Sequence, residues 1–437
     1  MTDELASASQ FQLDEQQRQR GLFVGNRPLC TVLRPRFLTP EQYRFLQSQL
    51  GLLLRAFDKV YRAAMEDTTF RAQFGLLDWE EQLIHHDPGF YYASAFARPD
   101  TFFVTERGSL CLIEYNGESP ASPAYCDTFI EIFYGLPVMR EFLRHYEVRS
   151  LPSRHSVMHV LLDAYKQWSR GYELPRIAIL DWREVPTYNE FVLFAQYFKA
   201  QGLECVIADP REVEYHNGRL MTGDFHITLI YKRVLLSELV AQGGLSHPIL
   251  RAVLEGAVCM VNPFRCKILD KKASLAVLSD ERNAAIFSLD ELEAIAAHIP
   301  WTCRVEERHT DYHGKKIDLL PYILEHREDF VLKPNDEYGG KGVVLGWQSD
   351  RARWAQALQT ALAEPYIVQE RVDIPSEPYP SVVDGCVVFA DRMLDINPFV
   401  FYGDYVDGCV SRLSSEALLN VSAGTGSTTP TFVVEKR

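Results

Sequence analysis

A glycine-rich segment between two apolar runs is the part of this sequence best suited to chemistry. The apolar run Phe330–Lys333 ends in a lysine, a glycine-rich turn follows, and a second apolar run leads to Gly346. This pattern predicts a β-hairpin whose tip closes over a phosphate chain, because glycines let backbone N–H groups approach phosphate oxygens. The residues expected to bind phosphate are Lys333, Gly339, Gly340, Lys341 and Gly342.

The segment is not a Walker loop. No Ser or Thr follows Lys341, and the residues beyond the turn predict a strand, whereas a Walker loop leads into a helix. A basic hairpin turn that binds no ligand is the alternative for this segment alone.

A second predicted hairpin, over 101–115, is flanked by acidic and amide side chains. Asp100 precedes it, and Glu114 and Asn116 come at its end. Glu114 and Asn116 share a face because side chains alternate along a strand, and a tight hairpin brings Asp100 beside them. Carboxylate and amide oxygens are ligands that Mg²⁺ accepts. The sequence therefore predicts a magnesium site, with an ion pair between Arg98 and an acid as the equally open alternative.

Two shorter motifs are consistent with a nucleotide site. The strand expected at 366–372 contains Gln369 and Glu370, which could present backbone amides to adenine and a carboxylate to ribose. A helix opens at Asp270 with two lysines, of which Lys272 could reach phosphate. Taken alone, these motifs read as an ordinary strand end and a solvated helix start.

Together, the motifs resemble the circularly permuted branch of the ATP-grasp superfamily, which includes the catalytic domain of glutathionylspermidine synthase. The segment from Lys333 to Gly342 resembles that family's phosphate lysine and glycine-rich loop, and Lys272 its second ATP lysine. Gln369 and Glu370 resemble the hinge that holds adenine. Glu114-Tyr-Asn116 precedes the glycine-rich loop, whereas in unpermuted ATP-grasp ligases the metal motif follows it. The permutation would place the 101–115 hairpin in one sheet with strands from 382–413.

The resemblance implies an ATP-dependent carboxylate–amine ligase that uses ATP and Mg²⁺, with two ions expected. A substrate carboxylate would take the γ-phosphate to give an acyl phosphate, and an amine would displace phosphate. Arg98 and Arg412 would neutralise the developing charge or grip the carboxylate; a strand-edge ion pair is the other reading of Arg412. The partners implied are a small-molecule or peptide carboxylate and an amine.

Two rival functions remain open, a kinase on the same fold and a non-catalytic nucleotide-binding partner protein. The sequence has no N-terminal amidase domain with a Cys/His pair, and its glycine-rich loop differs from the type found in polyamine enzymes. Substrate identity is therefore not carried over from the resemblance.

The fold class expected is α/β (α+β), a permuted ATP-grasp fold around a central α/β domain. Strands alternate with helices between Gly171 and Arg265, which predicts a small parallel sheet. We divide the chain into an N-terminal helical region (1–84), the metal-binding part of the C-terminal lobe (85–170), a pre-ATP-grasp domain (171–265), the N-terminal lobe with the glycine-rich loop (266–372) and the rest of the C-terminal lobe (373–437).

Other elements are expected from periodicity and turn residues. Residues 1–20 predict a frayed or solvated helix. Further helices are expected at 40–74, 123–147, 155–170, 187–201, 246–256, 271–279, 289–297 and 350–363, and further strands at 176–181, 204–209, 227–231, 258–261, 382–389, 393–400 and 408–413.

The bulk properties favour a cytoplasmic protein that binds neither nucleic acid nor membrane. The 437 residues carry a net charge of −14, whereas binding to nucleic acid depends on Lys and Arg neutralising phosphates. Nine scattered cysteines predict free thiols in a reducing compartment. No apolar run is long enough to span a bilayer. The oligomeric state is left open.

Two further segments invite a functional reading. His85 and His86 are adjacent, so they would point to opposite faces of an extended segment, and a loop histidine bonded to Asp87 is expected instead of a metal site. The glycine- and threonine-rich loop at 422–430 is expected to cover the active site, or to be a simple turn.

Overall fold

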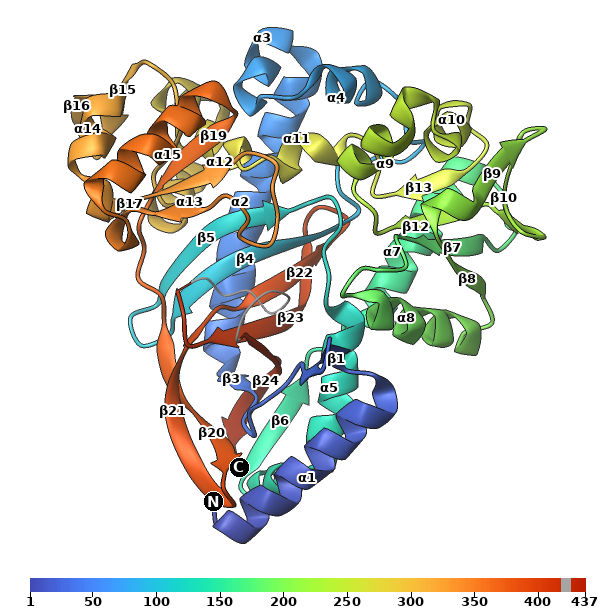
Figure 1. Ribbon diagram of the computed structural model, residues 1–437, viewed down its shortest axis with the longest axis vertical. Coiled ribbons are helices and arrows are strands. Elements are labelled where there is room, and N and C mark those ends of the chain that lie inside the picture. The colour runs from blue at the N-terminus through green and yellow to red at the C-terminus, as the bar shows by residue number, and fades with distance from the viewer. Residues whose placement is uncertain (418–425) are drawn as a thin grey trace.

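The computed structural model describes residues 1–417 and 426–437. A large mostly antiparallel sheet occupies the middle of the molecule, with two smaller lobes above it in Figure 1. Its strands follow the order β20-β21-β23-β22-β4-β5. Their bounds are β4 Phe96–Val104, β5 Ser109–Asn116, β20 Ser376–Val383, β21 Cys386–Leu394, β22 Asn397–Phe401 and β23 Tyr405–Ser414. The predicted hairpin is thus confirmed, and it joins strands that come more than 250 residues later, because β4 pairs with β22 (Ala97 with Val400).

Both ends of the chain are joined to this sheet. β24, Ser427–Lys436, pairs antiparallel with β23 and β6, and parallel with β3. The N-terminal elements and those that follow the first hairpin are α1 Asp3–Arg20, β1 Phe23–Val24, β2 Arg27–Pro28, β3 Arg36–Leu38, α2 Pro40–Glu66, α3 Thr68–Arg71, α4 Asp78–Leu83, α5 Pro123–Gly135, α6 Pro137–Phe142, β6 Tyr146–Ser150 and α7 Arg154–Ser169.

The second lobe contains the predicted parallel sheet. Its four strands are all parallel, in the order β13-β12-β7-β8. Its elements are β7 Arg176–Leu180, α8 Tyr188–Ala200, β8 Glu204–Ala208, β12 Leu229–Lys232, α9 Leu236–Gly243, α10 Pro248–Leu254 and β13 Cys259–Val261, with a small antiparallel sheet of β9 Val213–His216, β10 Arg219–Thr222 and β11 Phe225–Ile227.

The third lobe carries the glycine-rich segment. Its sheet follows the order β14-β19-β17-β18, so that β17 and β18 form the predicted hairpin. Its elements are α11 Cys266–Asp270, α12 Ala273–Ser279, α13 Leu289–His298, β14 Thr302–Arg304, β15 His309–Tyr312, β16 Lys315–Asp318, α14 Leu319–Glu325, β17 Phe330–Pro334, β18 Val344–Leu345, α15 Arg351–Ala363 and β19 Tyr366–Glu370. Short 3₁₀ helices lie at Ala72–Phe74, Pro210–Glu212, Gly244–Ser246, Glu281–Ile286, Arg327–Asp329 and Gly346–Gln348.

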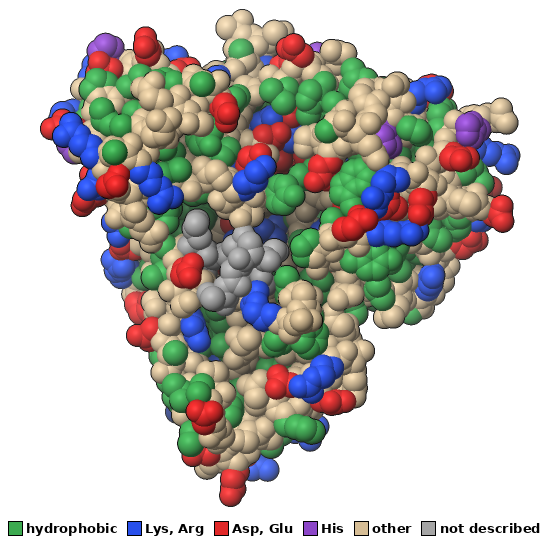
Figure 2. All heavy atoms as spheres, viewed as in Figure 1, with side chains coloured by type: hydrophobic (Ala, Val, Ile, Leu, Met, Phe, Trp, Pro, Cys, Tyr) green, Lys and Arg blue, Asp and Glu red, His purple; other side chains and the backbone are tan. Residues whose placement is uncertain are grey.

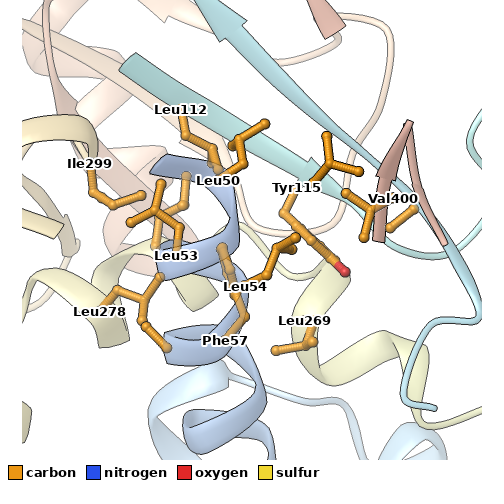
Figure 3. Close-up of a cluster of buried hydrophobic side chains, with 14 of the residues drawn as sticks. Leu50, Leu53, Leu54, Phe57, Leu112, Tyr115, Leu269, Leu278, Ile299 and Val400 are labelled. Atoms are coloured by element: carbon orange, nitrogen blue, oxygen red, sulfur yellow. The ribbon is translucent and has the colours of Figure 1, made fainter. Parts of the chain in front are cut away.

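Helix α2 connects the large sheet to the third lobe. It begins with a reciprocal cap in which Thr39 Oγ1 accepts from the Gln42 amide and Gln42 Oε1 accepts from the Thr39 amide, followed by Pro40. The apolar face of α2 packs between β5 and the helices of the third lobe (Figure 3). The side chains that meet there are Leu50, Leu53, Leu54, Phe57, Leu112, Tyr115, Leu269, Leu278, Ile299 and Val400.

Four predicted elements are wrong in part. The helix expected at 123–147 is interrupted at Pro137 and gives way to β6, because proline lacks the N–H that would continue the helix. The strand expected at 382–389 spans a hairpin turn, since Asp384 and Gly385 have φ of 48° and 79°. The strand expected at 393–400 is divided between β21 and β22. Helix α1 is not a solvated element: Ala6, Leu13 and Gln17 are buried.

Other expectations concern absences and the loop near the C-terminus. All nine cysteines are free thiols, as predicted. Within residues 1–417 and 426–437, no helix has both the length and the apolar character needed to cross a membrane. Of the loop expected at 422–430, residues 422–425 lie outside the described residues, and residues 427–430 belong to β24.

Candidate active site between the hairpins

The first hairpin places the predicted metal ligands side by side. Asp100 lies opposite Glu114, and Arg98 lies opposite Asn116, in adjacent antiparallel strands. The register shifts between Asp100 and Thr101, which is a β-bulge, a device that re-aims side chains. Asn116 Nδ2 donates to the backbone oxygen of Arg98 at 3.1 Å, which fixes the orientation of its amide. The strands of this hairpin extend beyond the expected 101–115 and include all four residues.

Two arginines hold the Asp100 carboxylate. Arg98 donates to it through Nε at 2.7 Å and Nη2 at 3.2 Å, and Arg412 Nη2 donates at 2.7 Å. Arg412 also donates through Nε to Asp395 Oδ2 at 2.7 Å. Burial alone would raise the pKa of Asp100, but the charges of Arg412 and Arg98 hold it below its usual value. Both arginines therefore form the ion pairs that the sequence left open as alternatives. Strand β23 brings Arg412 to the same carboxylate as Arg98.

The two predicted ATP lysines reach the same hairpin from the third lobe. Lys272 Nζ lies 2.8 Å from Glu114 Oε1 and donates to the backbone oxygen of Glu337 at 2.5 Å. Lys333 Nζ donates to the backbone oxygen of Ile113 at 3.1 Å. Residues far apart in the sequence thus converge, and acidic and basic side chains lie together in the hollow between the two upper lobes (Figure 2).

Lys333 is unusual because neutral groups hold its ammonium. Its second acceptor is Gln369 Oε1 at 2.6 Å. Gln369 Nε2 in turn donates to Thr302 Oγ1 at 3.0 Å, and the Thr302 hydroxyl donates to the backbone oxygen of Pro300 at 2.7 Å. This chain of bonds orients the amide of Gln369 with its oxygen toward the lysine. Burial lowers the pKa of Lys333 to about 8, although the nearby charge of Glu114 opposes the shift.

The predicted adenine hinge differs in detail from expectation. Gln369 binds Lys333 through its side chain, and β19 is paired on both sides, with β14 and β17. The backbone amide of Glu370 donates to the Trp301 oxygen at 2.8 Å. The carboxylate of Glu370 accepts from the Tyr312 hydroxyl at 2.8 Å. These bonds already use the Glu370 amide that the sequence suggested for adenine, so any adenine contact from this amide would require rearrangement.

Three glycines of the glycine-rich loop have positive φ. Gly339, Gly340 and Gly342 have φ of 64°, 78° and 72°, which side chains rarely adopt. A Cβ on Gly342 would lie 2.6 Å from Pro334 Cγ, so this glycine also allows a close approach. Lys341 is exposed and pairs with Glu337 at 2.9 Å.

A buried ionic network, which the sequence did not predict, anchors the stem of this loop. Lys267 Nζ lies 2.5 Å from Asp336 Oδ1 and 3.0 Å from Glu118 Oε2. Lys232 from the second lobe lies 3.0 Å from Glu118 Oε1, and Lys271 lies 3.1 Å from Asp336 Oδ2. Lys271 also reaches Glu80 from α4 at 2.8 Å. The only sequence signal was the spacing of Glu118, two residues beyond Asn116.

The histidine pair does not form a metal site. His86 packs edge-on against Phe264 with ring centroids 5.6 Å apart, and Asp87 accepts from the Gly89 amide at 3.0 Å. Among the described residues, no group of three or more His, Cys, Asp or Glu side chains could hold a metal ion. The predicted magnesium site comprises two carboxylates and an amide, so it is not such a group. Its oxygen donors suit Mg²⁺, and in this structure Lys272, Arg98 and Arg412 balance the two carboxylates.

Comparisons with known proteins agree with this picture at the level of the fold. No family model matches the chain. Two proteins named glutamate–cysteine ligase, 2-2 of Frankia casuarinae and 2-3 of Frankia alni, are each 26% identical over 215 residues, which is 46% of this chain. The match spans 23% of the length of each of these relatives.

A solved structure matches over nearly the full length. The glutathione synthetase-like effector of Globodera pallida, in its apo form, aligns with 99% of this chain and 98% of its own, with a TM-score of 0.64 and 13% identity. At that identity the likeness concerns the fold. The chain therefore shares the fold of that effector.

Proposed function

We propose that this protein is an ATP- and Mg²⁺-dependent ligase that joins a carboxylate to an amine through an acyl phosphate. One observation carries the proposal: Lys272 and Lys333, from the lobe with the glycine-rich loop, meet the Glu114 strand of the large sheet. A phosphate-binding set and an oxygen-donor set would thus meet at one site, and phosphoryl transfer needs this combination of positioning and charge.

We also propose that the ATP-grasp topology is circularly permuted here. In support, the hairpin with Glu114 and Asn116 precedes the glycine-rich loop in sequence, yet it lies in the same sheet as β22 and β23, which follow that loop. Residues 85–170 and 373–437 would then form one lobe, with the parallel α/β domain inserted between the halves of the fold.

The proposed site residues have three roles: they bind the phosphates, hold Mg²⁺ and stabilise charge on the reacting groups. Lys272, Lys333 and the amides of the glycine-rich loop would hold the phosphates. The oxygens of Asp100, Glu114 and Asn116 would hold Mg²⁺, which when bound supplies positive charge to the phosphate oxygens. Lys272 is bonded to Glu114 in this structure, so its ammonium is already placed beside the metal ligands.

The arginines would act on the reacting groups. A carboxylate oxygen of the substrate attacks the γ-phosphorus, and the bond to the ADP oxygen breaks. The amine nitrogen then attacks the acyl carbon, phosphate leaves with the bridging oxygen, and the nitrogen loses a proton. Arg98 and Arg412 carry fixed positive charge at this end of the hollow, which favours the negative charge that develops in both steps.

The substrate classes are inferred from chemistry and from the names of relatives. Proteins named glutamate–cysteine ligase match 46% of this chain, which is consistent with a small-molecule or peptide carboxylate and an amine as substrates. Because only 23% of each relative is matched, their substrates are candidates and not assignments.

The test is an ADP-release screen over amino acids, short peptides and polyamines, with mass spectrometry of the products. With an ¹⁸O-labelled acid, the acyl phosphate route moves one ¹⁸O into inorganic phosphate and forms an amide. The Lys333→Ala variant is the control for contaminating ATPases. A stable phosphorylated product without phosphate release would show a kinase. Binding of ATP without turnover of any acid–amine pair would favour a non-catalytic nucleotide-binding protein.

A further inference from the structure

A cavity lies on the reverse face of β5, the strand that carries Glu114 and Asn116. Its volume is about 350 Å³, within the range of small-molecule sites. Side chains alternate along β5, so Tyr115 points away from its two neighbours, and it lines this cavity. Figure 3 shows Tyr115 between α2 and Val400, above Leu269. Neither Lys272 nor Lys333 lines the cavity, which is therefore separate from the candidate active site.

The cavity wall is aromatic. Tyr91 and Tyr92 meet edge to face at 5.9 Å, and Tyr92 and Tyr402 at 5.5 Å. Deeper in, Phe57 and Tyr115 lie 4.7 Å apart. Tyr91 is 60% exposed at the mouth, although exposed aromatic rings are unfavourable in water. A continuous aromatic surface of this kind suits a ligand with an apolar body.

The same surface already receives a cation from the protein. The Arg62 guanidinium lies over the Tyr91 ring, 5.5 Å from its centroid. Aromatic faces attract cations through the negative potential of the ring, most strongly where water is excluded. Tyr91 thus already contacts a cation of the protein, and the rings of Tyr92 and Tyr402 remain for a ligand.

The charges around the cavity favour a cationic ligand. Each basic side chain of the lining is paired with an acid: Arg62 with Asp58 at 2.7 Å, Lys59 with Glu291 at 2.6 Å and Arg55 with Asp290 at 3.2 Å. Asp404, which also lines the cavity and is exposed, has no ion-pair partner among the described residues. Of the charged side chains that line the cavity, Asp404 is thus the one whose charge is not balanced by an ion pair within the described residues.

We propose that this cavity binds a small organic ammonium ion with an apolar body, held by the tyrosine wall and by Asp404. The proposal does not depend on the ligase function, because it uses none of the residues assigned to ATP or Mg²⁺. The ligand would contact the back of the strand that carries Glu114.

The experiment compares two probes of nearly equal shape, 2-phenylethylammonium and neutral 2-phenylethanol, by calorimetry at constant ionic strength without nucleotide. We expect the ammonium ion to bind about tenfold tighter than the alcohol, as cation–π and carboxylate contacts act together. In the Asp404→Asn variant this preference should fall to about twofold or less. Asp391→Asn, a change at an exposed acid outside the cavity lining, is the matched control and should keep the full preference.

Three results would overturn the proposal. These are equal affinity for the two probes, a preference that survives Asp404→Asn, or no binding of either probe at millimolar concentration. The Lys333→Ala variant should bind the ammonium ion as the natural protein does. Loss of binding in this variant would place the probe in the active site and overturn the second site, whatever the outcome for ligase activity.

Discussion

Lys333 holds its ammonium between the amide oxygen of Gln369 and the backbone oxygen of Ile113, and none of the described carboxylates pairs with it directly. Burial lowers its pKa to about 8, so the folded protein favours the neutral lysine more than the unfolded chain does. Below pH 8 the buried charge of Lys333 therefore lowers the free energy of unfolding. As the pH rises above 8 this destabilisation is lost, because the folded protein releases the proton before the unfolded chain does.

We therefore expect Lys333→Met to raise the melting temperature at pH 7, and to raise it less at pH 9.5, where the natural lysine is already neutral. ATP affinity should fall in the same variant, and in the natural protein it should weaken as the pH rises through 8. Thermal denaturation and calorimetric titration over pH 6–9.5 test both statements. Lys341→Met, at an exposed position, should show no pH-dependent change in melting temperature. A uniform destabilisation of Lys333→Met would contradict the assignment of a buried charge.

Glu114 is bonded to Lys272 and lies opposite Asp100, so its carboxylate belongs to the charge balance of the site. Removal of that charge in Glu114→Gln, combined with Asn116→Ala, should lower turnover roughly 10²- to 10³-fold per group, as for other preorganised electrostatic contacts. The measurement is steady-state ADP release, with circular dichroism to verify the fold. Glu106→Gln, at the exposed tip of the same hairpin, is the control. Near-normal turnover in the double variant would refute the metal assignment.

At the level of elements, the hairpin of β17 and β18 depends on Gly342. This residue has φ of 72°, and a Cβ would lie 2.6 Å from Pro334. Gly314, between β15 and β16, also has positive φ (80°), but no atom lies within 4 Å of its added Cβ. Both Gly→Ala variants meet the backbone penalty, roughly 1–2 kcal/mol, and only Gly342→Ala meets the contact.

We expect Gly342→Ala to displace the loop and so to weaken the binding of a non-hydrolysable ATP analogue at least about tenfold. This corresponds to a loss of roughly 1.4 kcal/mol or more of binding free energy. Gly314→Ala should leave the affinity unchanged while lowering the melting temperature slightly. Calorimetric titration of both variants distinguishes the two effects. Equal losses of affinity would mean that backbone strain alone, and not the approach to Pro334, governs the loop.

The same elements show what could be read from the sequence. Both hairpins were predictable because apolar alternation is interrupted by glycine, and the parallel sheet because short apolar runs alternate with helices. The Asp384-Gly385 turn carried a readable signal, since Asp-Gly is a preferred hairpin pair, but the apolar residues on both sides masked it. Pro137 likewise marks the end of a helix, but the apolar periodicity that continues beyond it suggested one longer helix.

The parts of the site that could not be predicted depend on contacts between distant segments. Glu118, Lys232, Lys267 and Asp336 lie in four segments, and no local pattern shows that they meet. For the strand of Gln369, the sequence suggested backbone amides for adenine, because the strand resembles a hinge. The bond between the Gln369 side chain and Lys333 follows from the pairing of β17 with β19, which sequence periodicity does not specify.

At the level of the whole molecule, Lys267 joins Glu118, which follows the first hairpin, to Asp336 of the third lobe, and Glu118 also pairs with Lys232 of the second lobe. Lys267→Met would remove the buried cation that Glu118 and Asp336 share, and each carboxylate would keep one other lysine, Lys232 or Lys271. Breaking a buried ion pair typically costs about 3–5 kcal/mol. We expect a large loss of stability to urea at pH 7, and a smaller loss at pH 5, because these carboxylates can then take up protons. Lys316→Met, at an exposed position, is the control. A loss that does not vary with pH would point to packing instead of charge.

The division of the site between both halves of the chain gives a further prediction. A protease site introduced at 171–174, where Tyr172 is 97% exposed, would cut the chain between Glu114 and Lys333. The nicked protein should still bind Mg-ATP while its pieces remain associated. The pieces separated in denaturant and refolded alone should not bind it, and mixing should restore binding. Full affinity in the piece beginning at 171 would contradict the shared site.

β24 hydrogen-bonds to β3, β6 and β23, and it is translated after all three. On the ribosome, the emerging chain therefore exposes strand edges that have no partner until residues 427–436 have been made. Unpaired edges recruit other chains, so translation that stalls before Ser427 should release an aggregation-prone product. The sheet that unites the two ends of the fold thus makes successful folding depend on completed synthesis.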